Sequence, residues 1–320
     1  MGGCSYDRDV YSGSSSSGWG SSNGFGASDY SASRLSSTSL DSSMLPNGKI
    51  LESKAKYPII IMLDVTGSNI NFARVVYDKA PMFYGQIEQK GYLEDFDIAF
   101  CAVGDAYTDS YPLQISQFAK GIELDSWLEK LILEGCGGGQ EKESYELAAY
   151  YLYKNAKFAP GSKPIIFFIG DEKPYPTVNM RQAEQFDIDI KEDGIEPFKL
   201  LREKVSDNVF MLLNKYCGRD FESEIVKCWE NLLAPEHVIK INEEKAIVDL
   251  MLGIISMLSS SRTLETYKID MIDRGQTKAR IEGVSKSLEN LSTALVPVKI
   301  TGDITKVSSD KKSTQRGRRL

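Results

Sequence analysis

The chain has 320 residues, of which 42% are hydrophobic and 26% are charged. These proportions are typical of a globular protein, and the length allows one large domain or two small ones. The formal net charge of -7 at pH 7 argues against a nucleic-acid-binding surface spread over the whole chain.

Cysteine usage and hydropathy predict where the protein resides. The chain has 5 cysteines, an odd number, with no Cys-x-x-Cys pair and no secretory leader. This pattern predicts reduced thiols and a cytoplasmic location. No stretch approaches the roughly 20 consecutive apolar residues that a membrane-crossing helix needs, so we expect no membrane span.

Both ends of the chain predict disorder. Residues 1–50 are rich in Ser and Gly and contain few aliphatic side chains, so they have little to bury. Residues 299–320 are polar and basic, which predicts a disordered tail. That tail is the one segment expected to offer a local basic patch to nucleic acid, anionic lipid or an acidic protein. A solvated tail with no fixed partner is the alternative.

Between these segments, apolar runs alternate with helical patterns. Strands are predicted at 59–64, 97–103, 111–115, 164–169, 209–213 and 237–241, and helices at 70–90, 124–133, 141–155, 196–205, 221–233 and 243–258. Pro81 is expected to kink the first helix or to start a second one. This alternation predicts an α/β domain over residues 57–258, with a doubly wound, mostly parallel, Rossmann-like sheet flanked by helices. Residues 259–298 predict a mixed extension with helical character.

Oxygen-bearing side chains follow the first apolar strand. Asp64, Thr66 and Ser68 alternate along the turn that ends it, and Asp171 ends a later apolar strand in the same way. Ligands of open α/β sheets bind beyond the carboxyl ends of the strands. Carboxylate and hydroxyl oxygens suit Mg²⁺, Mn²⁺ or Ca²⁺ and offer nothing to a soft metal.

A purely structural interpretation of these residues also exists. Ser68 or Asn69 could cap the following helix, and Asp64 could accept hydrogen bonds from loop amides. The repeated pattern, an apolar strand that ends in an acid, favours the ion site.

This pattern resembles the von Willebrand factor A (VWA) domain over about residues 57–258. That family carries a metal-ion-dependent adhesion site (MIDAS), with Asp-x-Ser-x-Ser in a first loop, a Thr in a second and an Asp in a third. Here Thr66 replaces the first Ser and keeps the hydroxyl, and Asp171 matches the third-loop Asp. The resemblance therefore implies a variant MIDAS.

The second loop departs from the usual Gly-Gly-Thr. Gly137-Gly138-Gly139-Gln140-Glu141-Lys142-Glu143 is similar to the Gly-Gly-Gly-Asp-x-x-Glu of A domains associated with atypical α-kinases. Gln140 occupies the Asp position and Glu143 matches the Glu. By resemblance, the metal site consists of Asp64, Thr66, Ser68, Asp171 and Gln140.

The expected function is metal-dependent protein–protein interaction rather than catalysis. Two neutral hydroxyls leave a bound Mg²⁺ electrophilic, so an Asp or Glu from a partner protein can complete its coordination. The resemblance implies multiprotein assemblies as partners, including those built on AAA+ ATPases.

Two other interpretations stay open. The first is a VWA-fold scaffold whose metal site is degenerate. The second is a Mg²⁺-dependent phosphoryl-transfer enzyme, because Asp64-Val65-Thr66-Gly67-Ser68 resembles the phosphorylation loop of P-type ATPases. The single histidine, His237, has no evident catalytic partner in the sequence, and no catalytic constellation is found.

Overall fold

The computed structural model describes residues 40–133, 142–187, 190, 195–216 and 220–295. The chain divides into two units, Met1–Ser36 and Ser37–Leu320, and every residue described here belongs to the second. Residues 1–39 of the predicted disordered segment, the basic tail at 299–320 and Gln140 lie outside the described residues.

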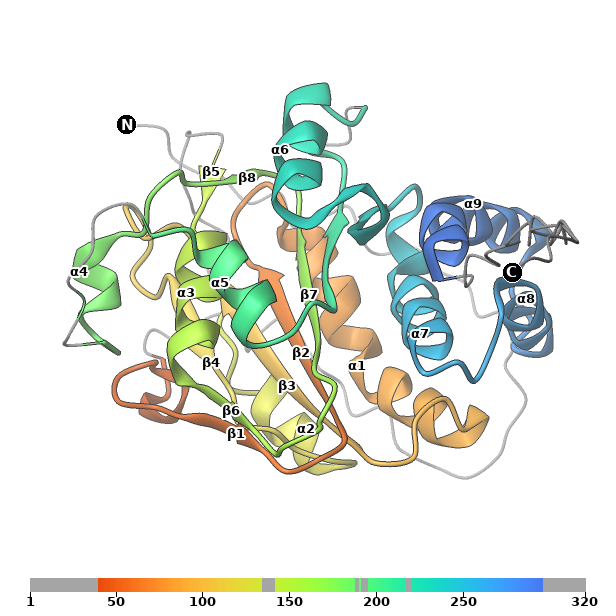
Figure 1. The fold of residues 1–320 in the computed structure, drawn as a ribbon, viewed down its shortest axis with the longest axis horizontal. Coiled ribbons are helices and arrows are strands. Elements are labelled where there is room, and N and C mark those ends of the chain that lie inside the picture. The colour runs from red at the N-terminus through yellow and green to blue at the C-terminus, as the bar shows by residue number, and fades with distance from the viewer. Residues whose placement is uncertain (1–39, 134–141, 188–189, 191–194, 217–219, 296–320) are drawn as a thin grey trace, which may run out of the picture. The chain divides into compact units, whose positions relative to one another are not determined.

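A six-stranded sheet forms the centre of this unit (Figure 1). Its strands, in spatial order, are β10 (Val238–Lys240), β9 (Val209–Leu213), β7 (Ile165–Gly170), β2 (Tyr57–Asp64), β3 (Phe96–Val103) and β4 (Leu113–Ile115). All neighbours are parallel except β4, which runs antiparallel to β3 at the edge. The predicted doubly wound, mostly parallel α/β fold is confirmed.

Helices cover both faces of the sheet (Figure 1). One face carries α1 (Ile70–Lys90), α2 (Glu123–Leu128) and α7 (Ile247–Leu258), and the other carries α3 (Tyr145–Asn155), α5 (Pro197–Lys204) and α6 (Ser223–Leu233). A short helix, α4 (Met180–Ala183), follows β7. Because both faces are covered, β3, β7 and β9 are buried at every residue, which explains why their sequences are apolar except for Asp97 in β3.

Two further helices form the extension after the sheet. These are α8 (Leu264–Asp273) and α9 (Lys278–Leu295), and α9 packs against both α7 and α8. No helix among the described residues is both long enough and apolar enough to cross a membrane.

The folded unit begins earlier than the predicted boundary at residue 57. A 3₁₀ turn at Ser42–Met44 buries the Met44 side chain completely. Strand β1 (Leu51–Ser53) pairs in parallel with β6 (Ala156–Phe158) in a separate two-stranded sheet. The Tyr151 hydroxyl donates to the Lys49 carbonyl at 2.9 Å, so residues 40–53 are held against the domain.

Helix α1 has its predicted bounds, whereas α2 and α3 are each shorter than predicted. α1 runs through Pro81 without interruption. α2 ends at Leu128 instead of 133, because the buried Gln114 side chain binds both the N–H and the carbonyl of Ile132. α3 begins at Tyr145 instead of 141, because β5 (Lys142–Glu143) pairs in parallel with β8 (Lys173–Pro174).

Candidate functional site

The loops that follow β2 and β7 meet at one edge of the sheet. The two strands are parallel neighbours with Leu63 opposite Ile169, so their carboxyl ends lie side by side. The Ser68 hydroxyl donates to Asp171 Oδ1 at 3.2 Å and joins the two loops. The structure therefore brings together Asp64, Thr66, Ser68 and Asp171, four of the five predicted site residues.

Asp64 is the buried anchor of the first loop. Its Oδ1 accepts from the Thr66 N–H at 2.9 Å and from the Thr66 hydroxyl at 2.6 Å, and its Oδ2 accepts from the Tyr145 hydroxyl at 2.5 Å. The side chain is fully buried, and burial raises the pKa of its carboxyl while the bonds from Thr66 and Tyr145 lower it. Oδ1 of Asp64 thus accepts two hydrogen bonds from the protein, whereas Oδ2 accepts one and keeps a lone pair.

The start of α1 is tied to the sheet by two buried amides. The Asn69 side chain donates to the Asp64 carbonyl at 3.1 Å and accepts from the Asn214 side chain at 3.2 Å. The Asn214 N–H donates in turn to the Gly170 carbonyl at 2.7 Å. Neither Ser68 nor Asn69 uses its side chain to cap α1, so the capping interpretation does not account for them.

Asp171 and Glu143 are carboxyls buried beside other acids. One oxygen of each, Asp171 Oδ2 and Glu143 Oε2, is buried and has no hydrogen-bond partner among the residues that the structure describes. Burial, followed by the charges of Asp64 and Glu172, raises the pKa of Asp171 to about 8. Burial and the same two acids raise the pKa of Glu143 to about 10. An uncompensated cluster of this kind is costly unless a cation joins it.

The hydroxyls of Thr66 and Ser68 are oriented in a way that suits a cation. Each gives its proton to an aspartate, Thr66 to Asp64 and Ser68 to Asp171, so its lone pairs are left for another partner. Within the described residues, no group of three or more His, Cys, Asp or Glu side chains could hold a metal ion. An ion here would therefore depend on hydroxyl oxygens and water as well as carboxylates, a mixture that Mg²⁺ accepts.

Tyr145 and Gly170 complete the site and were not anticipated from the sequence. A Cβ atom at Gly170 would lie 1.9 Å from the Tyr145 hydroxyl and 2.9 Å from Asp64 Oδ2. Only glycine leaves room for the bond from Tyr145 to Asp64. Glu143 was matched to the family motif but not assigned as a ligand, and its position among Asp64, Asp105 and Glu172 makes it a further candidate.

Asp105 and His237 have structural roles. Asp105 accepts from the Tyr107 N–H at 3.0 Å and the Thr108 hydroxyl at 2.8 Å, so it stabilises a turn. The His237 ring packs on Phe210 with a centroid distance of 4.6 Å, and its Nδ1 lies 3.0 Å from the Val209 carbonyl oxygen.

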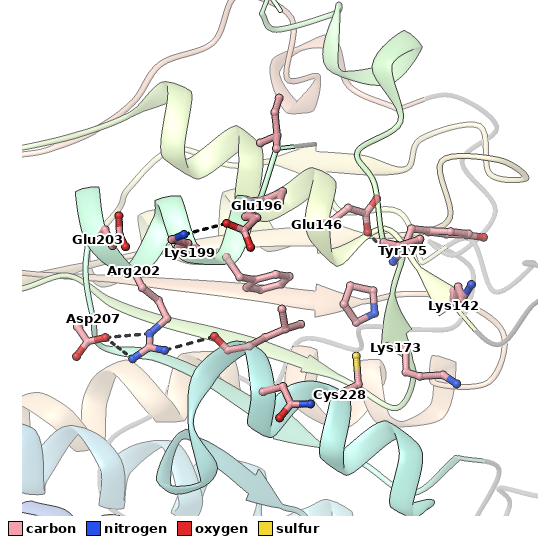
Figure 2. A pocket seen from close by; sticks show the side chains of 17 residues that line it. Lys142, Glu146, Lys173, Tyr175, Glu196, Lys199, Arg202, Glu203, Asp207 and Cys228 are labelled. Atoms are coloured by element: carbon pink, nitrogen blue, oxygen red, sulfur yellow. Dashed lines mark hydrogen bonds and ion pairs between the residues drawn. The ribbon is translucent and has the colours of Figure 1, made fainter. Parts of the chain in front are cut away.

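A cleft lies elsewhere on the same domain (Figure 2). It has a volume of about 900 Å³ and lies between α5, α6 and the short ladder of β5 and β8. Lys142 and Lys173 line it, whereas their chain neighbours Glu143 and Glu172 belong to the acidic cluster.

Comparison with known proteins gives only distant structural similarity. No family model and no curated protein matches the chain. The open conformation of the pilus adhesin SpaC from Lactobacillus rhamnosus GG superposes with a TM-score of 0.46 at 10% identity, over 66% of this chain and 31% of the adhesin. Proximal thread matrix protein 1 from the mussel byssus superposes with a TM-score of 0.41 at 12% identity, over 65% of this chain and 49% of that protein. The chain thus covers less than half of each of these two proteins.

Proposed function

We propose that this chain is a VWA-like, metal-dependent protein-interaction module. Asp64, Thr66, Ser68 and Asp171 would hold Mg²⁺, or Mn²⁺ or Ca²⁺, directly or through water. Gln140 is a proposed ligand on sequence grounds alone, and Glu143 is added by its burial in the same cluster.

One observation carries the proposal. The hydrogen bond from Ser68 to Asp171 brings together two loops that are 103 residues apart. Within the described part of the chain, Asp171 Oδ2 is buried with no hydrogen-bond partner. Burying an ionised carboxylate without compensation is unfavourable, and a divalent cation would supply the missing charge. The bound ion would offer an open coordination position to an Asp or Glu of a partner protein.

The proposed role is binding rather than turnover. Asp64, the residue that a phosphoryl-transfer mechanism would need as a nucleophile, is fully buried and uses both carboxylate oxygens to accept hydrogen bonds. This favours an anchoring role for Asp64. We further propose a cytoplasmic location from the cysteine pattern, and an AAA+ ATPase assembly as a partner from the family resemblance.

Calorimetric titration with Mg²⁺ and Mn²⁺ tests the metal site. Asp171→Asn keeps the shape of the side chain and removes its charge, so we expect at least about tenfold weaker binding. Asp220→Asn is the matched control, because the Asp220 side chain is fully exposed and far along the chain. Equal affinity in the native protein and Asp171→Asn, or no heat of binding from the native protein, would refute the site.

Capture of partners with and without EDTA separates adhesion through the ion from binding through another surface. If the ion is the contact, the captured proteins are lost in EDTA and in Asp171→Asn, and they persist in Asp220→Asn. Identical capture under all conditions would instead identify a scaffold with a degenerate site.

A further inference from the structure

The cleft between α5, α6 and the ladder of β5 and β8 is polarised along its length (Figure 2). Glu203 and Asp207 stand at one end, and Lys142 and Lys173 stand at the other. Most charges toward the acidic end are already paired, Lys199 with Glu196 at 3.0 Å and Arg202 with Asp207 at 2.7 Å. The two lysines at the basic end have less compensating charge.

Lys142 and Lys173 are held side by side with little compensating charge. They are direct partners in the parallel pairing of β5 with β8, a position in which like charges repel. Lys173 lies 3.7 Å from Glu224, whose side chain is 83% exposed, and Lys142 lies 5.8 Å above the Tyr175 ring. The exposed ion pair of Lys173 with Glu224 stabilises the lysine charge only weakly. An anion bound between the two ammonium groups would therefore be favourable.

The positive potential of this pair reaches the interior of the cleft. Cys228, which lines the cleft, has a thiol pKa raised by burial and lowered by Lys173 and Lys142. The lining also contains the apolar side chains of Pro174, Phe198 and Leu232. A charged end next to an apolar stretch is what an amphipathic ligand requires.

A polar group stands on the wall opposite this lining. Glu146 lines the cleft with a side chain that is 2% exposed, and its Oε2 accepts from the Tyr175 N–H at 3.0 Å. Its other oxygen, Oε1, is buried and has no hydrogen-bond partner within the described ranges of the chain. Such an orphaned oxygen is unfavourable unless a ligand supplies a hydroxyl or amide group.

We propose that this cleft binds a small amphipathic organic anion. Its carboxylate or phosphate head lies between Lys142 and Lys173, and its apolar body lies on Phe198 and Leu232. Glu146 becomes the hydrogen-bond partner for a polar group on that body once its side chain moves enough to expose the buried Oε1. The volume of about 900 Å³ is within the range of small-molecule sites. This site is distinct from the proposed metal centre and does not depend on it.

Calorimetry on the full chain with three probes tests the proposal. Phenylbutyrate and phenyl phosphate carry the two kinds of head on an aromatic body, and phenylbutanol is the neutral counterpart. We expect one of the anions to bind with a dissociation constant of about 1 mM or lower, the value typical of ligands of this size. We expect phenylbutanol to bind at least about tenfold more weakly, because it lacks the charge-assisted contacts.

Variants assign the binding to the cleft. Lys142→Met and Lys173→Met should each lower the affinity for the anion by about fivefold or more. Leu232→Trp should abolish binding, because the larger side chain fills the apolar part of the cleft. Lys278→Met is the control, since that side chain is 92% exposed on α9. Circular dichroism checks that each variant is folded, and Lys173→Gln is a milder substitution that serves if Lys173→Met does not fold.

Several results would overturn the proposal. Absence of binding by both anions, equal binding of phenylbutanol, or unchanged affinity in both lysine variants would each do so. Anion binding that persists in EDTA and in Asp171→Asn is expected. That result keeps this site separate from the metal proposal, whichever way the metal titration turns out.

Discussion

At the scale of single residues, the site depends on a close approach that only glycine permits. The Tyr145 hydroxyl reaches Asp64 across the position where a side chain at residue 170 would begin. Gly170→Ala should therefore displace Tyr145 and destabilise the fold by about 1–3 kcal/mol, as overpacking of a filled core does. Urea denaturation measures this change, and Mg²⁺ titration should show weaker binding.

The matched control is Gly85→Ala. Gly85 lies within α1, and a Cβ atom there meets nothing within 4 Å. The same substitution should stabilise the protein by about 0.5–1 kcal/mol, because alanine is the better helix former. Similar effects at both positions would show that the approach of Tyr145 to Asp64 has no energetic importance.

The buried carboxyl of Glu146 should make the stability of the fold depend on pH. Burial raises the pKa of its carboxyl to about 8, with a smaller contribution from Asp105. In the unfolded chain this pKa is about 4.3. The folded state therefore binds the proton more tightly, so this contribution to stability is complete below about pH 4 and is lost as the pH rises through about 8.

The prediction is tested with Glu146→Gln, which keeps an acceptor for the Tyr175 N–H and removes the titration. Between about pH 6 and pH 9, the melting temperature of the native protein should fall more than that of Glu146→Gln. Glu203→Gln, an exposed position on the same cleft, should follow the native protein. Parallel curves for the native protein and Glu146→Gln would contradict the assignment.

At the scale of elements, a buried polar cluster attaches α8 to the sheet domain. Arg274, which ends α8, donates to Asp249 of α7 at 2.8 Å and to the Tyr92 hydroxyl, beyond the end of α1, at 3.0 Å. Tyr92 donates to Asp270 at 3.0 Å, and Arg262 donates to the same carboxylate at 2.7 Å. The extension is thereby joined to two helices of one sheet face.

Arg274→Met should consequently destabilise the fold strongly. The Arg274 and Asp249 side chains are each 6% exposed, so the substitution leaves a buried carboxylate without its partner, at a cost of about 3–5 kcal/mol. Adding Asp249→Asn should recover part of this loss, because it removes the stranded charge. Chemical denaturation measures both, and Lys278→Met, in an exposed pair, should change stability by less than about 0.5 kcal/mol. A small effect of Arg274→Met would show that α8 is held by apolar packing alone.

At the scale of the whole molecule, the features predicted correctly from the sequence are those with a repeated local signal. The strands at 59–64, 165–169 and 209–213 are apolar at almost every position because helices cover both sides of them. Parallel strands place their carboxyl ends at one edge, so Asp64 and Asp171 could be expected to lie together.

Features that arise from contacts between distant segments left no such signal. β1 and β6 are three residues each and pair across about a hundred residues, and β5 and β8 are two residues each. In the sequence, Tyr145 looks like a core aromatic residue at the start of a helix. Only the structure shows that its hydroxyl donates to Asp64. The cleft is built from several separate segments and has no contiguous motif.

The short ladder of β5 and β8 joins the two proposed sites through one stretch of paired backbone. Glu143 follows Lys142 in β5 and Glu172 precedes Lys173 of β8, so the same short segments supply carboxyls to the acidic cluster and lysines to the cleft. If occupation of one site shifts this ladder, the free energies of binding at both sites are coupled. Thermodynamic reciprocity then requires the cation to change the affinity for the anion by the same factor by which the anion changes the affinity for the cation.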